Sequence, residues 1–198
     1  MSCALIAIKA RAQCKSRLAA VLTPAARLQL VRAMLDAVIS AARGAQTLRQ
    51  ILVVSPERDG VPVDIPVLAD AGGGLNGALS AAQMALHDFG CHEVVVLPAD
   101  LPHVTAADID ALVRAGRGGG FAIAPDAAGV GTNALYLNST LPFRFRFGLD
   151  SRRLHLEQAH GMGLIPQVVQ LAGLEFDVDS PDDVRRLEEP PWRTRLQA

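Results

Sequence analysis

The sequence predicts an α/β fold with a mainly parallel β-sheet that carries helices on both faces. Short, continuously apolar runs recur along the 198-residue chain, as expected of strands buried on both sides. Segments with helical spacing of apolar residues separate these runs, and this alternation is typical of strands joined through helices. The length fits one domain, 1–198, with a C-terminal tail at about 189–198.

Six apolar runs are the predicted main strands. They lie at residues 3–8, 51–54, 67–69, 94–97, 121–124 and 134–137. Residues 165–171 and 174–178 are predicted as two further short strands. The first run is too short to cross a membrane, and its positive charges follow it, so it indicates a buried strand instead of a signal peptide.

Helix signals fall between the strands. Thr23 and Pro24 suit an N-cap and a first helical position, and the helix that they open is expected to end at Gly44. The sequence Thr105-Ala106-Ala107-Asp108 resembles a capping box and begins another helix. Helices are also expected over 75–88, over about 150–160 and from Ser180 onward. The glycine-rich segment 116–120 is interpreted as a plain turn.

Composition narrows the possible functions. The formal net charge of −1, with scattered Lys and Arg residues, gives no basic surface for nucleic acid, and no segment suits a membrane span. Three separated cysteines without a CxxC pair argue against a disulfide framework or a zinc site. A reducing cytoplasm is therefore the expected compartment.

Ligands of such sheets bind at the carboxyl ends of the strands, so the loops there are the candidate site. Lys9, Arg11, Lys15 and Arg17 follow the first strand within nine residues and suit a triphosphate. A solvated surface loop explains the charges equally well, but their position at the end of the first strand favours phosphate binding. No GxxxxGK[ST] motif is present, so this loop is not a P-loop.

Carboxylates follow two other predicted strands. Asp100 lies just past the most apolar run, where it is well placed to hold Mg²⁺. Asp177 and Asp179 point to the same side if their segment is extended, and two such carboxylates repel unless a cation lies between them. Turn or helix capping is the alternative for each residue alone, but the three together favour a metal site.

Three glycine-containing segments can approach an anion or a flat ligand. They are Gly72 to Asn76, Gly129 to Asn133, and Phe147 to Ser151. Each of them alone is more often an ordinary turn. The histidines lack zinc-ligand spacing, and no GxSxG elbow supports Ser/His/Asp hydrolysis.

The ordered set of these motifs resembles the 2-phospho-L-lactate guanylyltransferase family of deazaflavin coenzyme F-420 biosynthesis. The resemblance covers roughly residues 3–188. The matching motifs are Lys9, Lys15-Ser16-Arg17-Leu18, Leu75-Asn76, LPADLP at 97–102, GTNAL at 131–135, Phe147 with FGxxSxxxH at 148–155, and DVDSP at 177–181.

The resemblance implies a Rossmann-like nucleotidyltransferase fold, GTP as donor and Mg²⁺ as cofactor. The acceptor would be a small phosphorylated acid: 2-phospho-L-lactate, phosphoenolpyruvate or 3-phospho-D-glycerate. It also allows a homodimer. Carried over by motif, the metal ligands would be Asp100, Asp177 and Asp179. The acceptor would be held by Lys9, Thr132, Gly148 and Ser151.

The remaining candidates concern the nucleotide. We expect the nucleotide to contact Arg11, Lys15, Gly73, Gly74, Leu75, Asn76 and Pro98, with Asn76 near the base or ribose. Lys9, Lys15 and Arg17 are the candidate catalytic cations. Backbone groups at a glycine-rich turn can pair with guanine without a charged side chain.

Two other classes of function remain as alternatives. A molybdenum cofactor or sugar-phosphate nucleotidyltransferase usually has a glycine-rich segment after the first strand, and residues 9–15 contain no glycine. A non-catalytic nucleotide-binding regulatory protein would not need three placed carboxylates.

Overall fold

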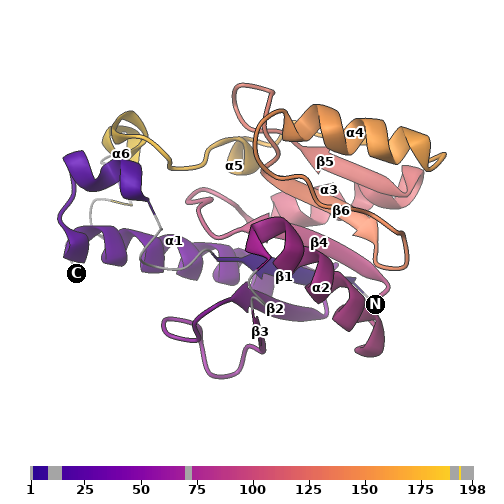
Figure 1. Ribbon diagram of the computed structural model, residues 1–198, viewed down its shortest axis with the longest axis horizontal. Helices are drawn as coiled ribbons and strands as arrows, with labels where there is room; N and C mark the ends of the chain where they lie inside the picture. Colours follow the sequence, from indigo (N-terminus) through magenta and orange to yellow (C-terminus); the bar gives the residue numbers. More distant parts are fainter. Residues whose placement is uncertain (1, 9–14, 70–72, 188–191, 193–198) are drawn as a thin grey trace.

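Seven strands form one sheet in the computed structural model, which describes residues 2–8, 15–69, 73–187 and 192. The strand order is β3-β2-β1-β4-β6-β5-β7 (Figure 1). The strands are β1 (Ser2–Ala7), β2 (Gln50–Ser55), β3 (Val67–Ala69), β4 (Glu93–Pro98), β5 (Phe121–Ala124), β6 (Ala134–Asn138) and β7 (Gln167–Val168). The helices are η2 (Ser16–Ala20), α1 (Pro24–Gly44), α2 (Gly74–Asp88), α3 (Ala106–Gly119), α4 (Ser151–Gly161), α5 (Ala172–Glu175) and α6 (Pro181–Leu187).

The sheet is mainly parallel, as predicted, with β6 as the exception. The central strand β1 pairs in parallel with β2 and β4, whereas β6 runs antiparallel to both β4 and β5. Because no helix lies in the connection from β5 to β6, the chain turns back on itself and the two strands must oppose each other. The turn before β6 therefore lies at the same sheet edge as the carboxyl ends of β1 and β4.

Helices cover both faces of the sheet, which confirms the predicted α/β architecture (Figure 1). One core cluster joins α1 and α3 to side chains such as Ile6, Val53 and Val95. The other joins α2 and α4 to side chains on the opposite face, such as Leu5 and Val96. Successive residues of β1 thus enter different cores, which explains its uninterrupted apolar sequence.

Two local predictions were wrong. The glycine-rich segment 116–120 is not a separate turn, because α3 continues to Gly119 and ends at Gly120 with φ 81°. A β-carbon at Gly116 would lie only 2.0 Å from the ring of Tyr136, so this glycine lets α3 approach β6 closely. Residues 174–178 do not form a strand, since α5 occupies 172–175 and the following residues pair with no strand.

The expectation that the chain forms no disulfide was also wrong. Cys3 and Cys91 are bonded across 88 residues, with their Cα atoms 5.9 Å apart, and both are fully buried. The cause is the parallel pairing of β1 with β4, in which Cys3 lies opposite Val94 and so close to Cys91. Cys14 lies outside the described residues.

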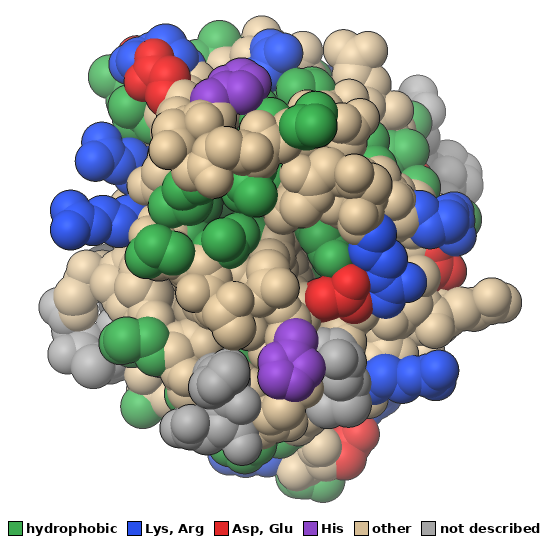
Figure 2. Space-filling view, turned by 90° about the vertical axis from the view of Figure 1, so that its right-hand side faces the viewer, with side chains coloured by type: hydrophobic (Ala, Val, Ile, Leu, Met, Phe, Trp, Pro, Cys, Tyr) green, Lys and Arg blue, Asp and Glu red, His purple; other side chains and the backbone are tan. Residues whose placement is uncertain are grey.

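The surface shows no concentration of basic residues on the face drawn in Figure 2, where Lys and Arg side chains are interspersed with acidic and apolar ones. Among the described residues, none of the helices combines the length and apolar character needed to cross a membrane.

The contact between Gly116 and Tyr136 generates a stability prediction. We expect Gly116→Ala to lower the free energy of unfolding by about 1–3 kcal/mol, because the added methyl group overpacks the core. Gly118→Ala is the matched control in the same helix, since nothing lies within 4 Å of its added β-carbon. It should be neutral or stabilising by up to about 1 kcal/mol. Urea unfolding of both variants measures the difference, and equal midpoints would contradict the packing explanation.

Candidate active site

Three carboxylates meet at the carboxyl edge of the sheet. Asp100 follows β4, and Asp177 and Asp179 lie between α5 and α6. One oxygen from each lies within 4.8 Å of the others. The structure thus brings together the three residues that the sequence suggested as metal ligands.

The two aspartates near α6 owe their orientation to the residues beside them. Phe176 and Val178 are buried in what we call the C-terminal apolar cluster, which consists of Leu18, Leu30, Met34, Ala37, Phe176, Val178, Val184, Leu187 and Trp192. In an extended segment, alternate side chains point to opposite sides. Burial of Phe176 and Val178 therefore turns Asp177 and Asp179 together toward Asp100.

Asn133, which the sequence suggested only as the end of a candidate anion-binding turn, supports this segment through its side chain. Its Nδ2 group donates to the backbone oxygens of Leu174 and Glu175, at 2.9 and 3.2 Å, and to Oδ1 of Asp177 at 3.3 Å. Burial, with the charges of Asp100 and Asp179, raises the pKa of Asp177 to about 6, against the lowering effect of the Asn133 hydrogen bond. The carboxylate is thus held in a position where it is costly to ionise without a cation.

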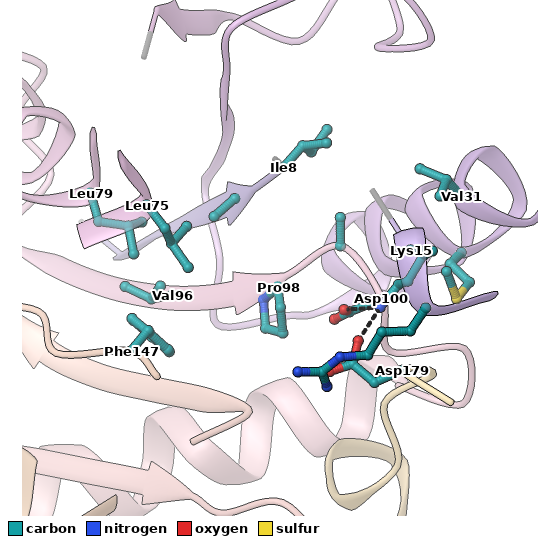
Figure 3. Close-up of a pocket in the computed structure, with 14 residues that line it drawn as sticks. Ile8, Lys15, Val31, Leu75, Leu79, Val96, Pro98, Asp100, Phe147 and Asp179 are labelled. Atoms are coloured by element: carbon teal, nitrogen blue, oxygen red, sulfur yellow. Dashed lines mark hydrogen bonds and ion pairs between the residues drawn. The ribbon is translucent and has the colours of Figure 1, made fainter. Parts of the chain in front are cut away.

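Lys15 provides part of the positive charge that the three carboxylates need. Its Nζ atom lies 2.5 Å from Oδ2 of Asp100 and 2.8 Å from Oδ1 of Asp179 (Figure 3). Burial would lower the pKa of Lys15, but the two carboxylates outweigh this effect and raise it above its ordinary value. The backbone of Lys15 is left-handed, with φ 55°. Strain of this kind is concentrated at functional sites, where the surrounding structure enforces it.

A cleft of about 360 Å³ opens beside these charges, within the size range of small-molecule sites. Lys15, Asp100 and Asp179 form its charged end (Figure 3), and Arg17 also lines the cleft. Leu75, Leu79, Val96 and Phe147 gather at its apolar end, and Pro98 lies between the two ends (Figure 3). The cleft can therefore receive a molecule that has one flat apolar part and one charged part, with a counter-ion where that part is anionic.

Gly74 and Leu75 of the predicted glycine-rich turn lead into this apolar end, whereas Gly72 lies outside the described residues. Gly74 begins α2 with φ 67°, a conformation that suits glycine, and Leu75 follows it into the cleft. The Asn76 amide exchanges two hydrogen bonds with the backbone of Phe147, at 2.8 and 3.1 Å. Asn76 thus ties α2 to the segment that leads to α4, and its proposed proximity to a base or ribose stays a prediction.

Thr132, Gly148 and Ser151 do not line this cleft themselves; they lie on two connected segments, one of which contributes Phe147 to its lining. The backbone N–H of Arg152, at the start of α4, donates to the Val130 oxygen at 3.1 Å and so joins α4 to the turn between β5 and β6. Gly148 has φ 129°, and Asp150 has φ 54° just before Ser151 opens the helix. Thr132 is adjacent to Asn133, which contacts Asp177.

The other candidate residues are placed as follows. Lys9 and Arg11 lie outside the described residues. Gly73 is described but does not line the cleft. His103 stacks on Phe176 at 5.3 Å between ring centroids and belongs to the C-terminal part of the fold instead of the cleft. His155, the last residue of the FGxxSxxxH motif, is fully buried and forms a hydrogen bond with Thr132.

The donor set fits a hard divalent cation. Carboxylate oxygens are the protein ligands that Mg²⁺ prefers, and it commonly combines one or two of them with substrate phosphates and water. Lys15 balances only one of the three negative charges. The cluster can accept a further cation, whose charge would offset the burial and the repulsion by Asp100 and Asp179 that together raise the pKa of Asp177.

The fold has counterparts among solved structures of nucleotidyltransferases. A protein from Desulfovibrio desulfuricans G20, assigned to the nucleotide-diphospho-sugar transferases, matches with a TM-score of 0.78 at 15% identity, over 99% of this chain and 94% of that one. The 4-diphosphocytidyl-2C-methyl-D-erythritol synthase of Anaerococcus prevotii matches with a TM-score of 0.64 at 11% identity, over 100% and 96%. At these identities the likeness establishes the nucleotidyltransferase fold alone.

Other proteins share a higher sequence identity with this chain than these solved structures do. A phosphoenolpyruvate guanylyltransferase from Rubrobacter xylanophilus is 40% identical over 190 residues, covering 93% of this chain and 92% of the relative. A 3-phospho-D-glycerate guanylyltransferase from Phenylobacterium zucineum is 33% identical over 205 residues, covering 98% and 93%. The family described as guanylyl transferase CofC-like matches residues 2–188. The chain therefore belongs to the CofC-like guanylyl transferase family.

Proposed function

We propose that this protein transfers GMP from GTP to the phosphate of a small phosphorylated acid and releases pyrophosphate. The observation that carries the proposal is the three-carboxylate cluster with Lys15 at the end of a partly apolar cleft. The apolar end suits a purine base, and the charged end suits a triphosphate and its counter-ion. A non-catalytic nucleotide-binding protein would not need the carboxylates.

The acceptor is expected to be phosphoenolpyruvate, 3-phospho-D-glycerate or 2-phospho-L-lactate. The first two give their names to the relatives from Rubrobacter and Phenylobacterium. All three carry a carboxylate and a phosphate. Hydrogen-bond donors at Thr132, Gly148 and Ser151 suit such a pair of anions, as does the start of α4.

The chemistry requires alignment more than proton transfer. An oxygen of the acceptor phosphate forms a bond to the α-phosphorus of GTP, and the bond from that phosphorus to the bridging oxygen of pyrophosphate breaks. A phosphate dianion is already deprotonated near neutral pH, so no general base is needed. Lys15 and Arg17 lie where they can offset the negative charge of the triphosphate.

We propose Mg²⁺ as the cofactor, held by Asp100, Asp177 and Asp179. When bound, the ion would neutralise phosphate charge and help to orient the donor. The residues themselves supply the binding site, and Asn133 holds one of them in place through its hydrogen bond to Asp177.

The family resemblance extends the proposal to the biological setting. We expect the product to serve deazaflavin coenzyme F-420 biosynthesis, and the enzyme to act in the cytoplasm, where GTP and phosphorylated acids occur. Nucleic acid and membranes are not expected partners. Association into a homodimer stays a prediction.

Removing one charge from the cluster should abolish transfer. Asp100→Asn and Asp179→Asn keep the side-chain shape but remove the charge that would hold Mg²⁺, so pyrophosphate release from GTP should fall by at least a hundredfold. Asp182→Asn is the matched control, because Asp182 is exposed and pairs with Arg185 outside the cluster. Near-normal turnover of a cluster variant at saturating Mg²⁺ would remove that residue from the ligand set.

Losing the Ser151 hydroxyl should affect the acid more than the nucleotide. A hydrogen bond to a charged group contributes about 1.5–3 kcal/mol, so Ser151→Ala should raise the KM for the acid by roughly tenfold or more. The KM for GTP serves as the internal control. Steady-state kinetics with each acid measures the two KM values. Equal changes in the KM for the acid and the KM for GTP would contradict the assignment of Ser151 to the acceptor site.

The protein should prefer GTP to ATP. Guanine presents an acceptor at C6 and an amine at C2, whereas adenine presents a donor at C6 and lacks the amine. Each mismatch leaves a polar group unpaired at a cost of roughly 1–3 kcal/mol. We expect kcat/KM for GTP to exceed that for ATP by at least tenfold, with the best acid saturating. Comparable values would show that the cleft does not select guanine.

A further inference from the structure

His155 connects the two segments that carry the candidate acceptor residues. It lies on α4, four residues after Ser151, and is fully buried. Its ring packs against Phe143 and Phe147, with centroids 5.6 and 5.1 Å away. Both ring nitrogens have partners: Nε2 lies 2.9 Å from the backbone nitrogen of Arg146, and Nδ1 lies 3.1 Å from Oγ1 of Thr132.

The backbone partner determines which ring nitrogen carries the proton. A backbone N–H can only donate, so Nε2 of His155 must be unprotonated in order to accept from Arg146. The single proton of the neutral ring is therefore on Nδ1, which donates to Oγ1 of Thr132. Burial, and then the charge of Arg146, lower the pKa of His155 to about 4, so the ring is neutral at neutral pH.

This tautomer makes the Thr132 hydroxyl oxygen a hydrogen-bond acceptor for His155, so the hydroxyl can act as a donor only toward another group. Within the described part of the chain, no other residue forms a hydrogen bond with this hydroxyl. Thr132 is nearly buried and lies next to Asn133, which holds Asp177 of the carboxylate cluster. A hydroxyl proton in this position is available for an anion that binds between α4 and the cluster.

We propose that His155 is a positioning residue for the acceptor, which makes the Thr132 hydroxyl a hydrogen-bond donor to the acid's phosphate or carboxylate. This inference rests on the proposed function. The same ring holds the backbone of Arg146, two residues before Gly148, so it fixes both sides of the acceptor site. A residue with a single hydrogen-bonding group could not do both.

Two substitutions separate the two hydrogen bonds. His155→Gln can place an acceptor near the position of Nε2 but supplies no donor at Nδ1. His155→Asn can place a donor near Nδ1 but does not reach Arg146. We expect His155→Gln to raise the KM for phosphoenolpyruvate or 3-phospho-D-glycerate about fivefold to tenfold, as for one lost hydrogen bond. In the same variant the KM for GTP should change less than twofold. His155→Asn should raise the KM for the acid less than His155→Gln does.

A double-mutant cycle tests whether His155 acts through Thr132. Thr132→Val should raise the KM for the acid, and adding His155→Gln should then have little further effect. Equal multiplicative effects with and without the Thr132 hydroxyl would overturn the proposal, because His155 would then act by packing alone. Equal losses for the Gln and Asn variants would overturn it as well.

The ring itself offers a readout that needs no activity or variant. The ¹⁵N chemical shifts of His155 in the wild-type protein should show a protonated Nδ1 and an unprotonated Nε2 at pH 7. The opposite tautomer would overturn the inference even if every variant failed to fold. A wild-type protein that releases no pyrophosphate with any of the three acids would instead contradict the proposed function, and the tautomer would still decide the Thr132 hydrogen bond.

Discussion

The ion pairs of Lys15 with Asp100 and Asp179 are the interaction on which the arrangement of the site depends. They join segments 85 and 164 residues apart in sequence. Without a cation between them, carboxylates that approach within 4.8 Å repel one another, and partial burial strengthens that repulsion. The ammonium group of Lys15, on a side chain that is only 9% exposed, removes part of this cost and joins the start of η2 to the residues after β4 and before α6. Lys15 has a left-handed backbone here, a conformation that is sparsely populated for residues other than glycine.

Apolar packing offsets the repulsion between the carboxylates and keeps them close together. The segment that carries Asp177 and Asp179 belongs to no helix or strand, so backbone pairing cannot hold it. Phe176 and Val178 anchor it in the C-terminal apolar cluster, and burial of such a side chain stabilises by about 1.5–3 kcal/mol. The hydrogen bonds of Asn133 add directional control, since one amide group fixes two backbone oxygens and a carboxylate. The two aspartates of the carboxylate cluster on this segment are thus held in place by the buried side chains of the alternating residues, Phe176 and Val178.

The sequence predicted features that depend on local patterns and missed those that depend on strand order. Apolar runs located the six main strands, and the alternation of Asp177 with Val178 and Asp179 predicted that the two carboxylates share a side. The Cys3–Cys91 disulfide needs β1 beside β4, which no local pattern reveals. Gly116 looked like part of a turn because its reason for being glycine, the ring of Tyr136, lies on another element. The bonds of Asn133 and His155 likewise join segments that only the folded chain brings together.

Charge is distributed unequally between the two halves of the site, and the difference has a physical reason. The half beside β4 combines carboxylates with Lys15, whereas the described candidate acceptor residues, Thr132, Gly148 and Ser151, are all neutral; the fourth candidate, Lys9, lies outside the described residues. A buried cation on the acceptor side would need a counter-ion such as a carboxylate whenever the acid is absent, and that carboxylate would then compete with the acid for the cation. Neutral donors avoid that competition and cost less to bury. Their limitation is that they bind an anion only if each proton points in the right direction. A site of this kind therefore depends on residues that fix proton positions without adding charge, and a neutral, fully buried imidazole between Thr132 and the backbone of Arg146 meets that requirement.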